Sequence, residues 1–478
     1  MSIFSSPFFL KLTRKKPIDT PQLNELKRCL SAFDLTLLGV GAIIGTGIFV
    51  LTGIAAATTS GPGVVLSFVA AGLACAFAAF AYAEFSAMVG GSGSAYGYSY
   101  AAFGELIAWI IGWDLILEYG VAVAAVANGW AGYFNNALHV IGIDLPTYLV
   151  RGPWAEGADG AGWVNLPAFI IVLLLTIMLI VGVKQSAKLN TCMVFVKLLA
   201  IVIFLSVGIF HIDSANWHPF APFGWFSHNE VGKPIGIFAG ASVVFFAYVG
   251  FDAVSTATEE ANKPQRDIPI GILASLIFCT IIYIVVSGVL TGIIPYSELN
   301  VPSPVAFALQ QVGIHWASAL VATGVITGLT TVMLVLFYGL TRIITAMGRD
   351  GLLPPLFAEV NPKTQTPVKN TLLCGILMAI MAGFIPLDTL AELVNVGTLF
   401  AFVLVCLGVI VLRYTQPNAP RPFKIPAGIL VCSLGAVSCS ALITFLPHHT
   451  YERFVYWLAA GLVIYFSYGF YHSKREFA

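Results

Sequence analysis

Long apolar runs alternate with short polar connections along almost the whole chain. A helix crosses the roughly 30 Å hydrocarbon core of a bilayer with about 20 apolar residues, because each residue adds about 1.5 Å. Twelve runs are predicted to be transmembrane helices, at residues 34–56, 63–89, 105–134, 165–183, 190–210, 236–258, 268–294, 316–346, 370–385, 389–412, 427–446 and 453–472. The pattern therefore predicts an all-α integral membrane protein with twelve spanning helices.

The composition supports this class and removes others. Hydrophobic residues make up 58% of the chain and charged residues 10%, against about 25% charged residues in an average soluble domain. The 23 basic and 23 acidic residues cancel, so the basic excess of a nucleic-acid-binding protein is missing. The eight cysteines fall mostly inside apolar runs, at no metal-ligand or disulfide spacing. We therefore expect a lipid bilayer as partner, no nucleic acid, and neither a metal nor a cofactor.

The positions of the basic residues predict the orientation. Nineteen Lys and Arg residues flank one side of the twelve runs, three flank the other side, and Lys197 lies inside the fifth run, which accounts for all 23. Cytoplasmic connections hold the excess of Lys and Arg, so both termini are predicted to be cytoplasmic. The first 33 residues place a short apolar start before the basic residues, which is the wrong order for a cleaved signal peptide. We expect a multi-pass protein of a bacterial inner (plasma) membrane.

Glycines interrupt the first and the sixth apolar run. The first interruption is GAIIGTGIF at residues 41–49, and the second is FFAYVGFD at residues 245–252. Broken helices inside a bilayer are tolerated where the freed backbone groups meet something polar, so each break predicts a bound substrate or ion. The alternative is a packing surface, because small residues at four-residue spacing also let membrane helices approach closely.

The two breaks together favour a small molecule that carries both charges. Amide groups at the start of a half-helix attract a carboxylate, and free carbonyls at the other break can accept hydrogen bonds from an ammonium group. The breaks fall in the first and sixth runs, which suits a five-plus-five inverted repeat with two extra helices. This arrangement predicts amino acids as the ligand class.

The chain resembles a known family over nearly its whole length. Five strings are similar to the cationic amino acid transporter branch of the amino acid–polyamine–organocation superfamily: GAIIGTGIFV, YAEFSAMVGGSGSAYGYSY, GWDLILEY, FFAYVGFDAVSTATEEANKPQRDIPIGI and TRIITAMGRDGLLP. The resemblance implies a leucine-transporter-like fold with discontinuous helices 1 and 6, and a secondary transporter that works by alternating access. It divides the chain into a cytoplasmic segment at 1–33, a transport core at 34–412, and helices 11 and 12 with the C-terminus at 413–478.

The resemblance also implies a substrate site. It places the substrate carboxylate on the backbone amides of Gly45, Thr46 and Gly47, and the amine against the carbonyls of four further residues, Ile43, Phe246, Ala247 and Val249. Met333 in the eighth run falls where bacterial relatives line the side-chain pocket. Methionine is bulky, flexible and apolar, so we expect neutral amino acids of small to medium size in preference to arginine.

Lys197 is the most informative charged residue. It lies seven residues into the fifth run, about 10 Å from the cytoplasmic start, which is farther than a lysine side chain reaches in full. A charge at that depth is usually functional, and the alternative is a lysine that extends toward the headgroups. The resemblance implies a stand-in for the sodium ion of sodium-coupled relatives, with the amine near the break in helix 1. Our hypothesis is that Lys197 takes up and releases a proton, which would make the protein a proton symporter.

The remaining charges in or near the runs have two interpretations each. Glu84 and Glu105 lie near the cytoplasmic interface, as gate residues or loop anchors. Asp114 and Glu118 are four residues apart and share a helix face, where they could relay protons or face a water-filled vestibule. Asp252, with Glu259 and Glu260, is expected to pair with basic loop residues as an inner gate, with Lys263, Arg266 and Arg342 as candidates.

The sequence argues against two other classes of protein, enzymes and channels. The sequence has no HExxH or GxSxG string and no cluster of His and Asp in the runs, so we expect no enzyme. Two unlike broken helices in one chain do not resemble the repeated filter loops or charge rings of a channel. An amino acid exchanger and a carrier of cationic amino acids remain the alternatives to a proton symporter. The sequence leaves open whether a small membrane accessory subunit binds.

Overall fold

The computed structural model describes residues 11–15, 30–88, 95–155, 162–181, 187–230, 232–361 and 366–473. Parts of three sequence features lie outside these residues. They are most of the N-terminal segment 1–33, residues 89–94 of the glycine-rich string after the second run, and the side chain of Glu259.

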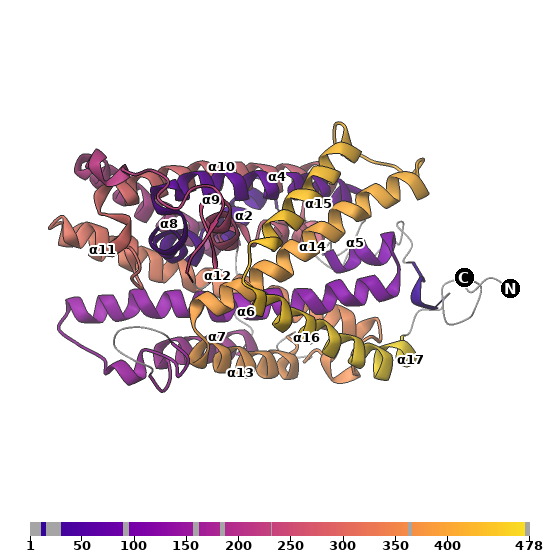
Figure 1. The fold of residues 1–478 in the computed structure, drawn as a ribbon. Helices are drawn as coiled ribbons and strands as arrows, with labels where there is room; N and C mark the ends of the chain where they lie inside the picture. Colours follow the sequence, from indigo (N-terminus) through magenta and orange to yellow (C-terminus); the bar gives the residue numbers. More distant parts are fainter. Residues whose placement is uncertain are drawn as a thin grey trace.

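The described chain is almost entirely helical (Figure 1). Its α-helices are α2 (Ala32–Ile43), α3 (Thr52–Ala55), α4 (Val64–Met88), α5 (Ala95–Ala102), α6 (Glu105–Val140), α7 (Leu166–Val181), α8 (Ala187–Gly208), α9 (Ile237–Val244), α10 (Pro264–Ile293), α11 (Pro304–Gln311), α12 (His315–Arg349), α13 (Val368–Phe384), α14 (Leu387–Thr415), α15 (Gly428–Thr444), α16 (His448–Ile464) and α17 (Phe470–His472). Short π-helices span Gly47–Leu51, Ala56–Ser60 and Tyr465–Gly469. Two short strands, β1 (Ser227–His228) and β2 (Pro234–Ile235), pair antiparallel in the connection before α9.

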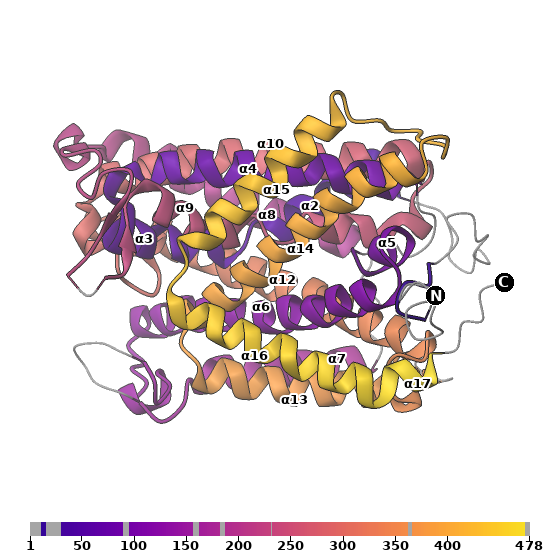
Figure 2. The same cartoon turned by 45° about the vertical axis from the view of Figure 1, so that its right-hand side comes forward.

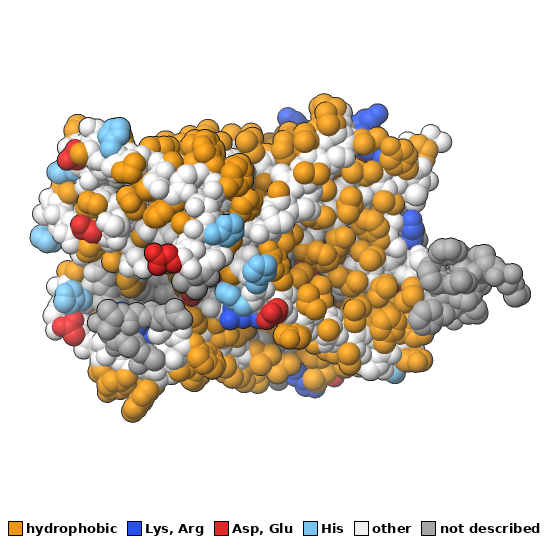
Figure 3. All heavy atoms as spheres, viewed as in Figure 1, with side chains coloured by type: hydrophobic (Ala, Val, Ile, Leu, Met, Phe, Trp, Pro, Cys, Tyr) orange, Lys and Arg blue, Asp and Glu red, His pale blue; other side chains and the backbone are white. Residues whose placement is uncertain are grey.

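The helices have the lengths and the surface of a membrane protein. Eight of them in the described residues, counting directly joined turns as one helix, are long and apolar enough to cross a bilayer. Four apolar helices of the described residues, α2, α7, α13 and α15, are shorter than this, so twelve spanning helices stay a prediction. Large apolar side chains such as Leu199, Val437 and Val463 are exposed on the outside of the bundle, and Figure 3 shows hydrophobic atoms across much of the viewed face. The predicted all-helical membrane class is confirmed, while the five-plus-five repeat stays a prediction.

Two sets of helices pack along each other in the bundle. Helix α10 packs along α4 and α2, and α6 packs along α12 and α14. In both views α4 and α10 lie along one side, and α7, α13 and α16 lie along the opposite side (Figures 1 and 2). Helix α8 packs against α2 and α12, so it lies next to the first predicted break.

The two described ends of the chain meet on one side of the bundle. The guanidinium of Arg14 donates to the hydroxyl of Ser473 at 3.0 Å and to the carboxylate of Glu105 at 2.7 Å. Leu30 forms an isolated parallel bridge with Ala261, which joins the start of α2 to the segment after the sixth run. These contacts place the described parts of both ends on the same side.

Candidate functional site

The first break is a real interruption of the helix. Helix α2 ends at Ile43, and Ile44 has an extended backbone with φ −72° and ψ 99°. The chain becomes helical again in the π-helix that begins at Gly47. The amide of Phe49 donates to the carbonyl of Gly45 at 3.3 Å, so the amides before Phe49 start the second half-helix, where the first N–H groups of a helix have no partner within it.

Lys197 holds the broken end of α2. Its ammonium donates to the carbonyl of Gly41 at 2.7 Å and to the carbonyl of Ile44 at 3.0 Å, and the side chain is fully buried. The side chain crosses Gly328 of α12, where an added Cβ atom would lie 3.3 Å from the lysine Cε. The last carbonyls of a helix need donors from outside it, and Lys197 supplies two of these bonds.

The second break lies in the sixth predicted span. Helix α9 ends at Val244 and is followed by a 3-10 turn at Phe245–Tyr248. Val249 then has an extended backbone, and Gly250 has φ +113°, a conformation that favours glycine. The chain resumes as a 3-10 helix at Asp252–Glu260.

The two breaks lie against each other. An added Cβ atom on Gly47 would come within 2.2 Å of the Cα atom of Ala247, so the two backbones touch at this point. The buried hydroxyl of Tyr283 in α10 lies 2.8 Å from the carbonyl of Ile43 and 2.8 Å from the carbonyl of Ala247. A phenol has one proton to donate, so it serves these two acceptors in turn or shares the proton between them.

Tyr283 is the site residue that the sequence analysis missed. The available signal was a single tyrosine inside the apolar run 268–294, because a buried tyrosine hydroxyl usually finds a hydrogen-bond partner. Its partners could not be deduced, since they belong to two other helices.

Helices α6 and α12 pack against the first break. The hydroxyl of Thr46 is buried and has no hydrogen-bond partner among the residues that the structure describes, and it packs on Gly129 of α6. Val332 of α12 lies 3.6 Å from the Cβ position of Gly45. Met333 follows Val332 on α12 and is fully buried. Phe246 is also buried, at the second break, and the assignment of Met333 and Phe246 to a substrate site stays a prediction.

The acidic residues separate into two groups. Asp114, Glu118 and Asp252 are buried inside the bundle, and Asp252 accepts a 2.8 Å hydrogen bond from the hydroxyl of Tyr119. The expected pairing of Asp252 with a basic loop residue is wrong, because the side chain turns inward to α6. In the described residues both oxygens of Asp114 lack a hydrogen-bond partner.

Glu260 and Glu105 lie at the basic side of the bundle. Glu260 pairs with Arg342 at 3.5 Å, as the sequence analysis expected. Glu105 is fully buried at the start of α6 and accepts hydrogen bonds from the hydroxyls of Tyr100, Tyr465 and Ser473 as well as from Arg14. Burial and the adjacent carboxylate raise the pKa of Tyr100, which keeps its phenol protonated as a donor. This geometry gives Glu105 the contacts of an anchor.

The described residues contain no group of three or more His, Cys, Asp or Glu side chains that could hold a metal ion. The donors and acceptors described at the two breaks are backbone groups, one lysine, one tyrosine and the hydroxyl of Thr46. Their chemistry suits reversible binding of a polar ligand.

Comparison with known proteins decides the family. The family model for amino acid permeases matches residues 30–466. This chain belongs to the amino acid permease family. The permease is 48% identical over 467 residues to the branched-chain amino acid permease BcaP of Bacillus subtilis (strain 168). The matched region covers 96% of this chain and 98% of that protein. It is also 48% identical over 466 residues to the methylthioribose transporter of the same organism, with 97% and 98% covered.

Cationic amino acid transporters are further relatives. The permease is 40% identical over 424 residues to cationic amino acid transporter 4 of Homo sapiens, which covers 86% of the permease and 64% of the human protein. These relatives confirm the predicted superfamily and identify a transporter family and not an enzyme family. They carry three different substrate names, so the family alone does not fix the substrate.

Proposed function

We propose that this permease is a secondary active transporter that takes up neutral amino acids of small to medium size together with protons, by alternating access. The observation that carries the proposal is the contact between the two interrupted helices at Gly47 and Ala247. Free amides at one break suit a carboxylate, and the carbonyls of Ile43 and Ala247 suit an ammonium group. The hydroxyl of Tyr283 lies 2.8 Å from each of these two carbonyls and so belongs to the same site.

Two observations support an apolar amino acid side chain. Val332 is buried and lies 3.6 Å from the Cβ position of Gly45, and Met333, the next residue of α12, is buried as well. A cationic side chain would lose its hydration against these residues without gaining a partner. The name of the branched-chain relative agrees with this preference, and valine is a suitable first substrate to test. Methylthioribose has neither a carboxylate nor an ammonium group, so it would leave the freed backbone groups at both breaks unpaired.

Lys197 supports proton coupling. A protonated lysine makes charge-assisted hydrogen bonds, which are stronger than those of a neutral amine. Loss of its proton would weaken the hydrogen bonds to the carbonyls of Gly41 and Ile44, and the end of α2 would then be freer to move. In this proposal the substrate and the proton therefore act on the same broken helix. The substrate binds the amides of its second half, and the proton changes the contacts of Lys197 with the end of its first half, α2.

The remaining predicted features belong to the same proposal. Residues 34–412 form the transport core with its inverted repeat, residues 413–478 add two helices, and residues 1–33 and the C-terminus are cytoplasmic. The protein lies in the inner (plasma) membrane, and a small membrane accessory subunit is a candidate partner. Asp114, Glu118 and Asp252 are candidates for a proton relay, because they are buried carboxylates between α6 and the second broken helix.

The experiment is uptake of labelled valine into proteoliposomes that contain the purified permease and no internal amino acid. An imposed gradient with the acidic side outside is expected to drive accumulation that saturates with valine concentration. Uptake only into liposomes preloaded with an amino acid would replace the symporter with an exchanger. Preferential uptake of arginine would instead assign the site to cationic substrates.

A further inference from the structure

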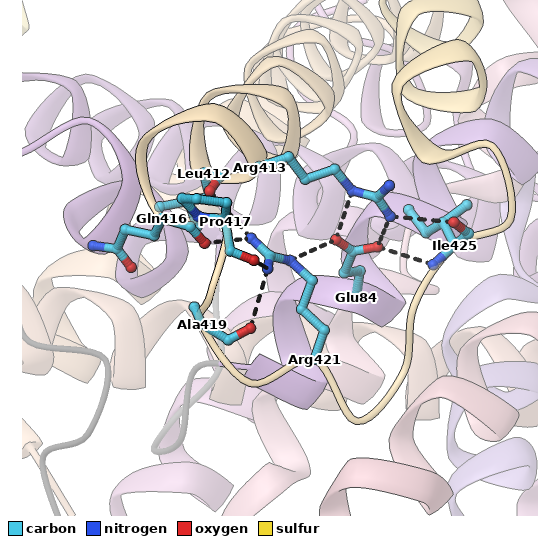
Figure 4. Close-up of polar contacts among 8 residues, drawn as sticks. All are labelled: Glu84, Leu412, Arg413, Gln416, Pro417, Ala419, Arg421 and Ile425. Carbon is cyan, nitrogen blue, oxygen red and sulfur yellow. Dashed lines mark hydrogen bonds and ion pairs between the residues drawn. The ribbon is translucent and has the colours of Figure 1, made fainter.

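A buried carboxylate is shared by two arginines at the basic side of the bundle. Glu84, near the end of α4, accepts hydrogen bonds from Arg413 of α14 and from the backbone amide of Ile425 at 2.9 Å (Figure 4). The Nε atom of Arg421 lies 3.5 Å from the same carboxylate, and its terminal nitrogens donate to carbonyls at the end of α14 and in the loop that follows, such as those of Leu412 and Ala419. One negative charge thus faces two positive charges.

An open cavity of about 680 Å³ lies beside this cluster. Arg413 and Lys424 line it with residues 425–430 and Ser433, and no acidic side chain is in that lining. The guanidinium of Arg413 lies against Gly428, the first residue of α15. With Lys424 added, the side chains around the cavity carry a net positive charge.

The start of α15 adds to the positive potential. Ala427 precedes the helix in a left-handed conformation and provides no side-chain cap, and the first turn contains no acidic residue. The amides at a helix start carry a partial positive charge and lack intrahelical partners. A cavity with these amides, a guanidinium and an ammonium is electrostatically complementary to an anion.

The cavity also has an exposed apolar wall. Ile429 and Leu430 line it and are 42% and 61% exposed, and Leu434 and Val437 continue the exposed face along α15. A ligand in this cavity would therefore meet positive charge at the membrane edge and apolar side chains beside it. Phospholipids have this same order of parts, with a phosphate followed by acyl chains.

The geometry points to a binding site for an anionic phospholipid, with the phosphate between Arg413, Lys424 and the start of α15, and an acyl chain along Ile429 and Leu430. Basic pockets between transmembrane helices on the cytoplasmic side suit anionic headgroups. The bound lipid would offset the positive charge that Glu84 leaves uncompensated, and would hold the loop between α14 and α15 to the rest of the bundle.

The test uses the full-length permease in detergent with phosphatidylglycerol, phosphatidylcholine or inorganic phosphate added. Native mass spectrometry counts bound lipid, and thermal unfolding gives the stabilisation. We expect phosphatidylglycerol to bind preferentially and to raise the melting temperature more than phosphatidylcholine does. Equal effects of the two lipids would overturn the proposal. An equal effect of inorganic phosphate would also overturn it, because the ligand would then be a free anion.

Two substitutions at one position separate charge from folding. Asp and Asn both tolerate the left-handed conformation of Ala427 and are nearly equal in size, so they differ mainly in charge. Ala427→Asp places a negative charge where the phosphate would lie, so the preference for phosphatidylglycerol should be lost, while Ala427→Asn should keep it. Lys424→Ala should weaken binding of this lipid about fivefold, the effect of one basic residue at an anionic surface. The exposed Arg266 serves as a control, and a loss in Arg266→Ala equal to that in Lys424→Ala would contradict the site.

Discussion

The ammonium nitrogen of Lys197 lies 2.7 Å from the carbonyl oxygen of Gly41, which joins the middle of α8 to the broken end of α2. The residues are 156 positions apart in the sequence. A charged donor at this point stabilises carbonyls that would otherwise be buried without a partner. This contact connects the fifth predicted span directly to the first break, where we propose that the substrate binds.

Replacement of Lys197 by methionine is the first prediction. Methionine keeps a long apolar stem but removes the charge and both hydrogen bonds, so we expect accumulation of valine driven by a pH gradient to be lost. Lys369→Met is the control, because that exposed lysine pairs with Glu359 away from the breaks. Proteoliposome uptake measures both variants. Gradient-driven accumulation by Lys197→Met at the rate of the control would refute the coupling role.

Removal of the Tyr283 hydroxyl is the second prediction. Tyr283→Phe deprives two carbonyls at the two breaks of their common donor, at a cost of about 1–3 kcal/mol in folding free energy, and should change valine affinity. Tyr133→Phe is matched, because its buried hydroxyl also donates to a carbonyl of the first span, that of Phe49, but beyond the break. Thermal unfolding and titration with valine separate the two effects. The assignment of Tyr283 fails if both variants bind valine as the unmodified protein does.

Two glycines of the first break provide the third prediction. Gly47→Ala would force a Cβ atom to within 2.2 Å of the Ala247 backbone, whereas Gly45→Ala would make an ordinary contact 3.6 Å from Val332. Backbone atoms cannot move aside as a flexible side chain does, so only Gly47→Ala should separate the two interrupted helices and abolish valine binding. Both variants keep their backbone amides. Equal affinity of the two for valine would show that the contact between the breaks is not required.

The side-chain pocket gives the fourth prediction. Met333→Ser removes bulk from the predicted side-chain pocket, so longer or more polar side chains should gain uptake relative to valine. Met347→Ser changes a fully buried methionine of the same helix that lies against Gly112, away from the breaks. Both losses of buried volume should destabilise by about 2–5 kcal/mol, but only the first should alter selectivity. Competition by a panel of amino acids measures it, and an unchanged order of preference would remove Met333 from the pocket.

The sequence predicted those features that depend on local pattern. Apolar runs located the helices to within a few residues in most cases, as at Glu105 and Leu166, because hydrophobic length is a local property. The breaks were predictable, since glycines in an apolar run weaken the helix locally. A polar partner for Lys197 inside the bundle was predictable from the depth of this residue in the fifth run, because an isolated ammonium needs a partner inside the membrane.

Long-range partners could not be deduced in the same way. Tyr283 reaches Ile43 across 240 residues, and Asp252 reaches Tyr119 across 133 residues. The direction in which Asp252 points follows from the unwound backbone at Gly250, which spacing on a regular helix does not describe. The ion pair of Glu84 with Arg413 likewise joins α4 to α14 across 329 residues.

The most direct test of the two-break site is calorimetric titration of the purified permease with valine and with two analogues that each lack one charge. Isobutylamine keeps the ammonium group and the branched chain, and isovalerate keeps the carboxylate and the branched chain. We expect valine to bind and each analogue to bind at least about tenfold more weakly, the loss expected when one charge-assisted set of hydrogen bonds of about 1.5–3 kcal/mol is missing. Either analogue binding as tightly as valine would contradict a site in which both interrupted helices hold the ligand.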